Sequence, residues 1–160
     1  MTVTHDGTVP GDLLHEFGSL LGAATLLERI ANRELERRCG IRHVVFEVLL
    51  RLSPSGARCP ATMGTLAGEL TLTSGGMTRL IDRMEDAGLV VRTTAEGDRR
   101  RQHVELTDAG SAKLAEALTV HTETLARHLA GPLTPTQRTA LAEALRALRT
   151  SARAELGALP

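Results

Sequence analysis

Small side chains followed by arginine make the segment from Thr73 to Arg79, TSGGMTR, the first candidate for chemistry. The N–H groups in the first turn of a helix attract phosphate, and small side chains let the phosphate approach them. Further along such a helix, a guanidinium can donate to both O6 and N7 of guanine. Alone, the segment also fits a solvated helix start, but its context favours a helix that enters the major groove of duplex DNA. The candidate contact residues are Ser74, Gly75, Gly76, Thr78, Arg79 and Arg83.

A second cluster, Arg99, Arg100 and Arg101, follows Asp98 between two β-prone runs. Gly97 can supply the turn of a hairpin, and Asp98 can hold that turn in place. Arginines at a hairpin tip can insert into the narrow, electronegative minor groove of A·T-rich DNA. The alternative is a solvated charge run that neighbouring acids dilute. We therefore predict that all four residues of this cluster serve DNA binding.

The elements that must position these residues follow from the spacing of apolar side chains. The predicted helices span 13–39, 41–52, 62–70, 73–88, 108–131 and about 141–152, the predicted strands span 89–94 and 102–106, and a loop is predicted at 53–60. Asp12 and Thr62 are predicted to cap helix starts, and Gly40 is predicted to end the first helix. Two closely joined helices followed by a hairpin predict a winged helix-turn-helix in a fold that is mainly α with a small β-hairpin.

The predicted helix at 73–88 has two distinct sides. Its apolar residues Met77, Leu80, Ile81 and Met84 cluster on one side and are predicted to be core. Asp82 lies opposite and is unsuited to face phosphate without a partner. We expect Asp82 to pair with an arginine, one candidate being an arginine of the hairpin, which would brace the hairpin against the helix.

The helical arms on both sides of the central region carry more apolar surface than one small domain needs, which predicts packing on a second copy of the chain. The first arm repeats Leu13, Phe17 and Leu20, and the last repeats Leu145 and Leu148. The predicted organisation is a flexible N-terminus at 1–10, N-terminal helices at 11–52, the winged helix-turn-helix at 53–108 and C-terminal dimerisation helices at 109–160.

The composition bounds the possible functions. A length of 160 residues fits one domain, or a small domain with a docking extension. The absence of Trp and Tyr disfavours aromatic platforms for single-stranded nucleic acid. Because P-loop, GxSxG, HExxH and dinucleotide motifs are absent, we assign no catalytic residue and no cofactor. No apolar run is long enough for a membrane and the N-terminus is unlike a secretory signal, so we expect a cytoplasmic protein.

The stretch from Thr62 to Gly110 resembles the winged-helix core of the MarR family of bacterial transcriptional regulators. The resemblance is carried by GGMTRLIDRMEDAGLVVR, by the D-x-R motif Asp98-Arg99-Arg100 that follows it, and by VELTDAG. The flanking helices also match the family's arrangement, so the resemblance extends from about Asp12 to the last helix.

This resemblance implies an obligate homodimer with interleaved terminal helices, in which each recognition helix enters a major groove of a pseudo-palindromic operator. Arg100 matches the wing arginine that reaches the minor groove, and Asp98 matches the residue that orders the turn. Thr62, at the start of the supporting helix, is expected to contact phosphate. Family members commonly repress nearby genes and release DNA when a small molecule binds. The implied partners are therefore double-stranded DNA, a second copy of the chain and a small-molecule effector.

Cysteines and histidines allow two other kinds of response within this family. Peroxide-sensing members use a reactive cysteine near the N-terminus supported by tyrosines, whereas Cys39 ends the first helix and no Tyr is present. We therefore read Cys39 and Cys59 as reduced, inert thiols. Zinc-sensing members invite comparison with Cys39, His43, His121 and His128, but His121 and His128 lie two helical turns apart, so no metal site is assigned. A winged helix that contacts only proteins is the alternative from another class.

Overall fold

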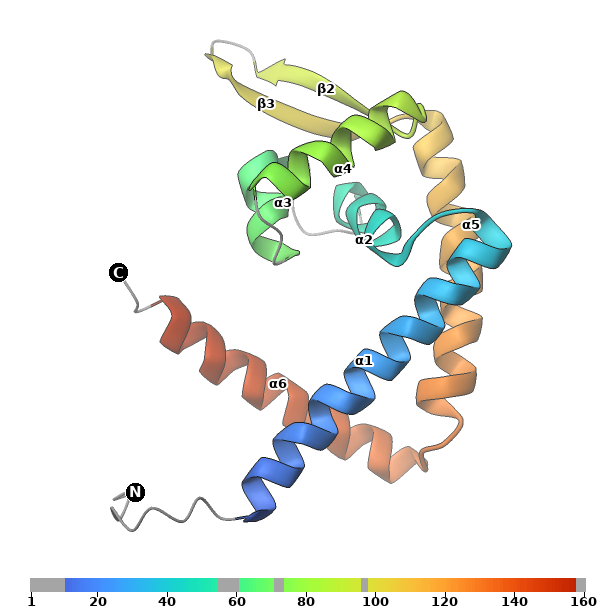
Figure 1. Ribbon diagram of the computed structural model, residues 1–160, viewed down its shortest axis with the longest axis vertical. Coiled ribbons are helices and arrows are strands. Elements are labelled where there is room, and N and C mark those ends of the chain that lie inside the picture. Colours follow the sequence, from blue (N-terminus) through green and yellow to red (C-terminus); the bar gives the residue numbers. More distant parts are fainter. Residues whose placement is uncertain (1–10, 55–60, 71–73, 96–97, 158–160) are drawn as a thin grey trace. The chain divides into compact units, whose positions relative to one another are not determined.

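The computed structural model describes residues 11–54, 61–70, 74–95 and 98–157, and at 61, 63, 69, 74, 94, 95 and 98–102 it describes the backbone only. The elements are α1 (Gly11–Cys39), α2 (His43–Leu52), β1 (Ala61–Thr62), α3 (Met63–Glu69), α4 (Ser74–Asp86), β2 (Val90–Ala95), β3 (Asp98–Leu106), α5 (Asp108–Leu125), the π-helical segment η1 (Ala126–Ala130) and α6 (Pro135–Gly157) (Figure 1). The predicted class, mainly helical with a small β-hairpin, is confirmed. The predicted flexible N-terminus, most of the 53–60 loop with Cys59, the predicted start at Thr73 and the turn at Gly97 lie outside the described residues.

The chain forms two compact units, residues 1–121 and 122–160. The first unit contains α1, the helix-turn-helix, the sheet and most of α5, and the second contains the end of α5, η1 and α6. None of the described helices combines the length and the apolar character needed to span a membrane.

The helix α1 ends as predicted, but its start differs from the prediction. The predicted cap at Asp12 is wrong, because α1 begins at Gly11 and Asp12 lies within its first turn, where a carboxylate favours the positive end of the helix. Gly40 ends the helix as predicted, with φ 68° and with its N–H donating to the carbonyl of Glu36 at 3.1 Å. The second helix begins at His43 rather than at residue 41.

The core of the first unit gathers apolar side chains from α1 to α5. Leu35 of α1 and Phe46 of α2 are fully buried. The predicted core side of α4 is confirmed, since all four of its members are buried: Met77, Leu80, Ile81 and Met84. On α5 the buried residues include Leu114, Ala117 and Val120. This common core fixes α4 relative to the rest of the unit.

The sheet has three strands in the order β1-β3-β2, all antiparallel. The two-residue strand β1, which pairs Ala61 with Val104, is missing from the prediction because two residues carry no alternating pattern. In the hairpin, β2 lies against α4 (Figure 1).

The tip of the hairpin differs from the prediction. Thr94 pairs with Gln102, and the next residue, Ala95, pairs with Asp98. Residues 99–101 of β3 therefore have no partners in β2 and form a bulge opposite the step from Thr94 to Ala95. The prediction that the three arginines project from a turn is wrong for the main chain, because β3 already begins at Asp98 and a β-bulge absorbs the extra residues.

The second unit is helical. After Leu125 the helix widens into η1, and a Cβ at Gly131 would lie 2.8 Å from the carbonyl oxygen of Arg127, so this position needs glycine. Among the described residues, α6 buries none of its side chains. The helix predicted at 108–131 carries a leucine repeat that is only partly buried, since Leu114 is buried but Leu118 and Leu129 are exposed.

Candidate nucleic-acid interface

A side-chain cap starts the first helix of the helix-turn-helix. Thr62 is extended, with φ −87° and ψ 158°, and its Oγ1 accepts a hydrogen bond from the N–H of Thr65 at 3.2 Å. The two threonine hydroxyls are 2.8 Å apart. The predicted cap at Thr62 is confirmed. It orients α3 so that Leu66 and Ala67 enter the core that α3 shares with α4.

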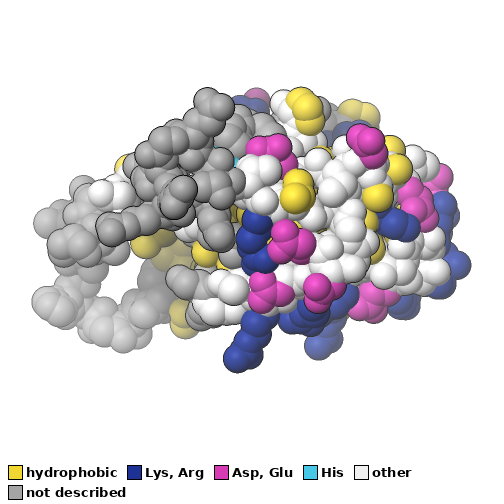
Figure 2. All heavy atoms as spheres, turned by 90° about the horizontal axis from the view of Figure 1, so that it is seen from above, with side chains coloured by type: hydrophobic (Ala, Val, Ile, Leu, Met, Phe, Trp, Pro, Cys, Tyr) yellow, Lys and Arg dark blue, Asp and Glu magenta, His cyan; other side chains and the backbone are white. Residues whose placement is uncertain are grey.

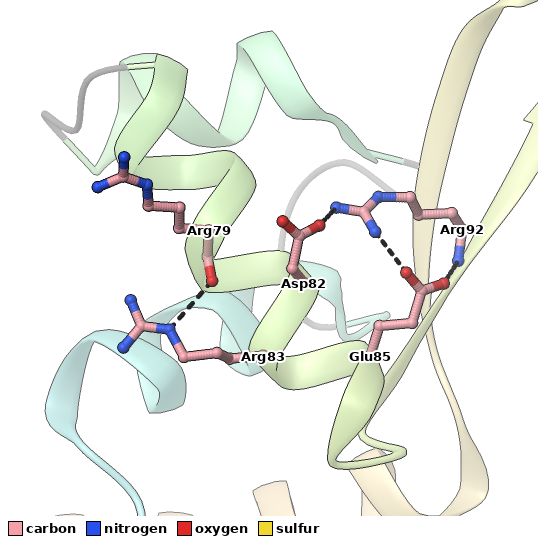
Figure 3. Close-up of polar contacts among 5 residues, drawn as sticks. All are labelled: Arg79, Asp82, Arg83, Glu85 and Arg92. Atoms are coloured by element: carbon pink, nitrogen blue, oxygen red, sulfur yellow. Dashed lines mark hydrogen bonds and ion pairs between the residues drawn. The ribbon is translucent and has the colours of Figure 1, made fainter.

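The open side of α4 carries the predicted contact residues. Gly75 is exposed and a Cβ there would meet nothing within 4 Å, while Gly76 is half-buried and Thr78 is exposed. Arg83 Nε donates to the carbonyl oxygen of Arg79 at 3.1 Å, and Figure 3 shows both guanidinium groups on the same side of the helix. Neither arginine forms an ion pair with any residue that the structure describes. Two guanidinium groups on the same side of one helix are suited to bind an anion.

Arg92 of β2 braces another side of α4. Its Nη2 lies 2.5 Å from Asp82 Oδ1, and its Nη1 forms an ion pair with Glu85 Oε2 (Figure 3). Its backbone N–H also donates to Glu85 Oε1 at 3.1 Å. Burial would lower the pKa of the Arg92 guanidinium, but the hydrogen bonds to Asp82 and Glu85 raise it above its usual value. The predicted pairing of Asp82 with an arginine of the hairpin is confirmed.

Glu85 is a functional position that sequence reasoning missed, although the sequence contains a signal for it. Arg92 follows the buried Val90 by two residues and pairs with the buried Val104, so it lies on the inner side of the strand. A charge in such a place needs a partner. Asp82 and Glu85, one turn apart on the preceding helix, offer two.

Glycines and a threonine fasten the base of the hairpin. Gly88, with φ 70°, ends α4 and donates its N–H to the carbonyl of Glu85 at 2.8 Å. Thr107 Oγ1 donates to Gly88 O at 2.6 Å and accepts from the N–H of Gly110 at 2.9 Å. A Cβ at Gly110 would lie 1.9 Å from the carbonyl oxygen of Leu89. These contacts give a physical reason for the VELTDAG motif.

The surface charge near this interface is mixed. Figure 2 shows basic and acidic side chains interspersed on the face viewed from above. The chain as a whole has a formal net charge of zero. Attraction of a polyanion therefore depends on where a few arginines are held rather than on a broad basic field. The side chains of Ser74, Asp98 and the three wing arginines lie outside the described residues, so their predicted contacts stay predictions.

Known proteins are similar to this chain in sequence and in fold. A MarR family model matches residues 40–101. The transcriptional regulator PecS of Dickeya dadantii is 27% identical over 125 residues, which cover 78% of this chain and 74% of PecS. The crystal structure of Sco3205, a MarR family transcriptional regulator of Streptomyces coelicolor in complex with DNA, is 28% identical with a TM-score of 0.79, covering 90% of this chain and 93% of Sco3205. AbsC, another MarR family regulator of that organism, is 26% identical with a TM-score of 0.79, covering 92% of this chain and 98% of AbsC.

By sequence and by fold, this chain is similar to regulators of the MarR family. The proteins that it matches are transcriptional regulators. The matched segment runs from the end of α1 through the wing arginines, so it contains the whole predicted contact set. The likeness to complete structures extends the family fold to the terminal helices.

Cys39 lies in an environment that disfavours redox chemistry. It is 6% exposed, and burial raises the pKa of its thiol. The thiolate, which is the form that peroxide attacks, is therefore disfavoured. Lys113 Nζ donates to the Cys39 carbonyl at 3.1 Å and so joins the end of α1 to α5.

His43 and His121 come together between α2 and α5. Their ring centroids are 5.4 Å apart, and the His121 ring lies 4.6 Å from that of Phe46. Burial, and then the charge of His43, lower the pKa of His121. Asn32 Oδ1 accepts the His43 backbone N–H at 2.9 Å. In the described parts of the chain, no three His, Cys, Asp or Glu side chains gather as metal ligands would.

Proposed function

We propose that this chain is a MarR-family regulator that acts in the cytoplasm as a homodimer and represses transcription by binding a pseudo-palindromic operator in duplex DNA. In each protomer α4 would lie in a major groove and the wing in the adjoining minor groove. One observation carries the proposal: Arg79 and Arg83 lie on the same open side of α4, where Arg83 Nε donates to the Arg79 carbonyl, while Arg92 braces another side. The proposed contacts are Thr62, Ser74, Gly75, Gly76, Thr78, Arg79, Arg83, Asp98, Arg99, Arg100 and Arg101.

Exposed apolar surface supports the homodimer. Large apolar side chains that are open to solvent in contiguous patches mark interaction surfaces. On the terminal helices these are Leu13, Leu14, Phe17, Leu20, Leu21, Leu26, Leu145, Leu148 and Leu156. A second copy of the chain would cover them.

A small-molecule effector is the proposed release signal. The recognition helices of a dimer must be about 34 Å apart to enter successive major grooves on one side of DNA. A modest rotation of either winged helix would spoil that spacing, so a ligand that favours the rotated state would release the operator.

A binding titration tests the DNA-binding proposal. The purified protein is titrated with DNA from upstream of its own gene and with random DNA of equal length, at several salt concentrations. Arg100→Ala is expected to weaken binding to both DNAs and to reduce the salt slope by about one. Arg79→Ala is expected to lose about 1–3 kcal/mol of discrimination between the two DNAs as well. Arg37→Ala, which removes an exposed arginine of α1, is the control and should change neither quantity.

Two outcomes would contradict the proposal. If Arg79→Ala weakens binding to operator and to random DNA equally, or if Arg100→Ala leaves both affinities and the salt slope unchanged, the roles assigned to α4 and the wing are wrong. If the wild-type protein binds both DNAs equally at every salt concentration, and screens of other DNA also find no preferred site, the winged helix serves protein contacts instead.

A further inference from the structure

The helix α4 carries more acidic than basic side chains. Its two arginines stand against three acids, Asp82, Glu85 and Asp86, so the formal charge of the helix is −1. Acidic groups are repelled by DNA phosphates, so a helix that enters a DNA groove must pair its acids or hold them away from the backbone. Arg92 of β2 is the cation that pairs with two of these three acids.

Asp82 lies next to the proposed base contacts on the helix surface. It follows Thr78 by four residues and Arg79 by three, and residues at these spacings are neighbours on a helix. Its side chain is 51% exposed, compared with 36% for Glu85 and 20% for Arg92. When α4 enters a major groove, the Asp82 carboxylate is therefore close to the DNA, whereas Arg92 lies deeper in the protein.

Without a partner, the Asp82 carboxylate would oppose DNA binding in two ways. It would repel the nearby phosphates, because like charges a few ångströms apart are unfavourable at a protein surface. It would also attract the guanidinium of Arg79, because an acid and an arginine three residues apart on a helix form an ion pair. Such a pair would occupy the donors that Arg79 needs for guanine.

The contacts of Arg92 counter both effects. Glu85 anchors Arg92 by accepting its backbone N–H at 3.1 Å and by pairing with its guanidinium. The anchored guanidinium places its Nη2 2.5 Å from Asp82 Oδ1, and Figure 3 shows the carboxylate turned toward it. In the same view the Arg79 guanidinium extends away from Asp82, and it forms no ion pair with any residue that the structure describes.

We infer that Arg92 promotes DNA recognition by holding the Asp82 carboxylate, which otherwise repels phosphate and competes with DNA for Arg79. The inference rests on the proposed function and adds a residue outside its contact set. Arg92 acts through Asp82 and does not touch DNA, so it is a positioning residue. Together with Glu85, these two side chains carry a formal charge of −1, which becomes −2 when Arg92 is replaced by a neutral residue.

A double-mutant cycle tests this role. Wild type, Arg92→Gln, Asp82→Asn and the double variant are titrated with DNA from upstream of the protein's own gene and with random DNA, at several salt concentrations. The double variant keeps the net charge of the wild type, because it loses one positive and one negative charge. The control cycle, Arg37→Gln and Glu34→Gln, removes an ion pair of α1. Circular dichroism checks that each variant is folded.

The expected results separate a charge effect from a structural one. Arg92→Gln is expected to raise the Kd for the upstream DNA at least about tenfold and to reduce the preference for it over random DNA. Asp82→Asn alone is expected to bind at least as tightly as wild type. The double variant is expected to return within about threefold of the wild-type Kd, although it lacks the brace. The control variants should match wild type.

Other outcomes overturn the inference in distinct ways. A double variant as weak as Arg92→Gln shows that Arg92 acts through the brace, and a salt slope lowered by about one in both variants shows that it contacts phosphate itself. Weaker binding by Asp82→Asn alone shows that the carboxylate supports DNA binding, a result that stands even if Arg92→Gln does not fold.

Two further outcomes separate this inference from the proposed function. Wild-type affinity of a folded Arg92→Gln variant shows that Asp82 is too far from the DNA to oppose binding, while the proposed function stands. A wild-type protein that prefers no DNA sequence removes the proposed function, and the role of Arg92 with it.

Discussion

Glu85 holds Arg92 at two points, accepting its backbone N–H at 3.1 Å through Oε1 and pairing with its guanidinium through Oε2. The strand that begins the wing is thereby tied to the helix that carries the open arginines, and Asp82 adds a third bond.

Removing Arg92 should cost more stability than removing a typical surface arginine. Its side chain is 20% exposed, and its loss leaves Asp82 and Glu85 without their shared partner. We expect Arg92→Ala to lower the free energy of unfolding by about 1–2 kcal/mol, since both acids are partly exposed and solvent screens part of the effect. Urea denaturation measures this change. Arg37→Ala, which breaks the exposed pair with Glu34, should cost about 0.5 kcal/mol or less, and equal losses for the two variants would argue against a structural role of the brace.

A methyl group at Gly110 should be poorly tolerated. The added Cβ would lie 1.9 Å from the carbonyl oxygen of Leu89, and a backbone carbonyl cannot move aside as a side chain can. We expect Gly110→Ala to destabilise the protein by about 3 kcal/mol or more. The matched control is Gly68→Ala in α3, where the new Cβ meets nothing within 4 Å and should add about 0.5–1 kcal/mol. A near-neutral thermal shift for Gly110→Ala would show that the contact between α5 and Leu89 relaxes easily.

Acidification should weaken the fold through His121. Burial and then His43 lower the pKa of His121 below 6.5 in the folded chain, so the unfolded chain binds this proton more readily. The stabilisation from neutral His121 is fully present above the pKa that His121 has in the unfolded chain. It is lost as pH falls through the lower pKa of His121 in the folded chain. We expect the free energy of unfolding to decrease between pH 7.5 and 5.5, with a slope from this group of at most about 1.4 kcal/mol per pH unit.

Replacement of His121 identifies the source of that slope. His121→Phe keeps a planar ring beside Phe46 and removes the titrating group, so the decrease between pH 7.5 and 5.5 should shrink. His128→Gln is the control and should keep the wild-type decrease. An unchanged slope in His121→Phe would place the pH dependence elsewhere.

Cys39 should react slowly with thiol reagents in the folded protein. The thiol is buried and burial raises its pKa, so the reactive thiolate is scarce. In a Cys59→Ser background, labelling of Cys39 by a disulfide reagent is expected to be slow without denaturant and fast in urea. Millimolar peroxide should leave operator binding of that variant unchanged. Rapid labelling together with loss of DNA binding would instead indicate a redox-responsive regulator.

Periodic and capping residues made most of the first unit predictable. Residue type and spacing alone predict three of its features, which are the core side of α4, the helix end at Gly40 and the cap at Thr62. The strand β1 does not follow from local chemistry, because a two-residue strand exists only through its pairing with β3 at Val104. The start of β3 was misplaced because a bulge depends on which residues of the partner strand are paired.

The candidate nucleic-acid interface was likewise predictable in part, and the rest depends on contacts between elements. The arginine segments were recognisable from residue type and spacing, and the pairing of Asp82 followed from the cost of an unpaired acid near phosphate. The second acid, Glu85, depends on the strand register, since only the pairing of Arg92 with Val104 places the arginine on the inner side of the hairpin. The exposed seam of α5 could not be foreseen, because a leucine repeat does not reveal whether its partner belongs to the same chain.

The helix α4 has a buried side, a side braced by Arg92 and an open side, and this arrangement bears on how such a regulator evolves. Residues that hold the helix in place, such as Ile81 and Glu85, are distinct from those on its open side, such as Gly75 and Arg79. Under the proposed function, substitutions on the open side would change the preferred operator while leaving the free energy of folding nearly intact. Duplicated genes with this architecture could therefore diverge in the promoters they control through a few surface changes, without compensating mutations in the core.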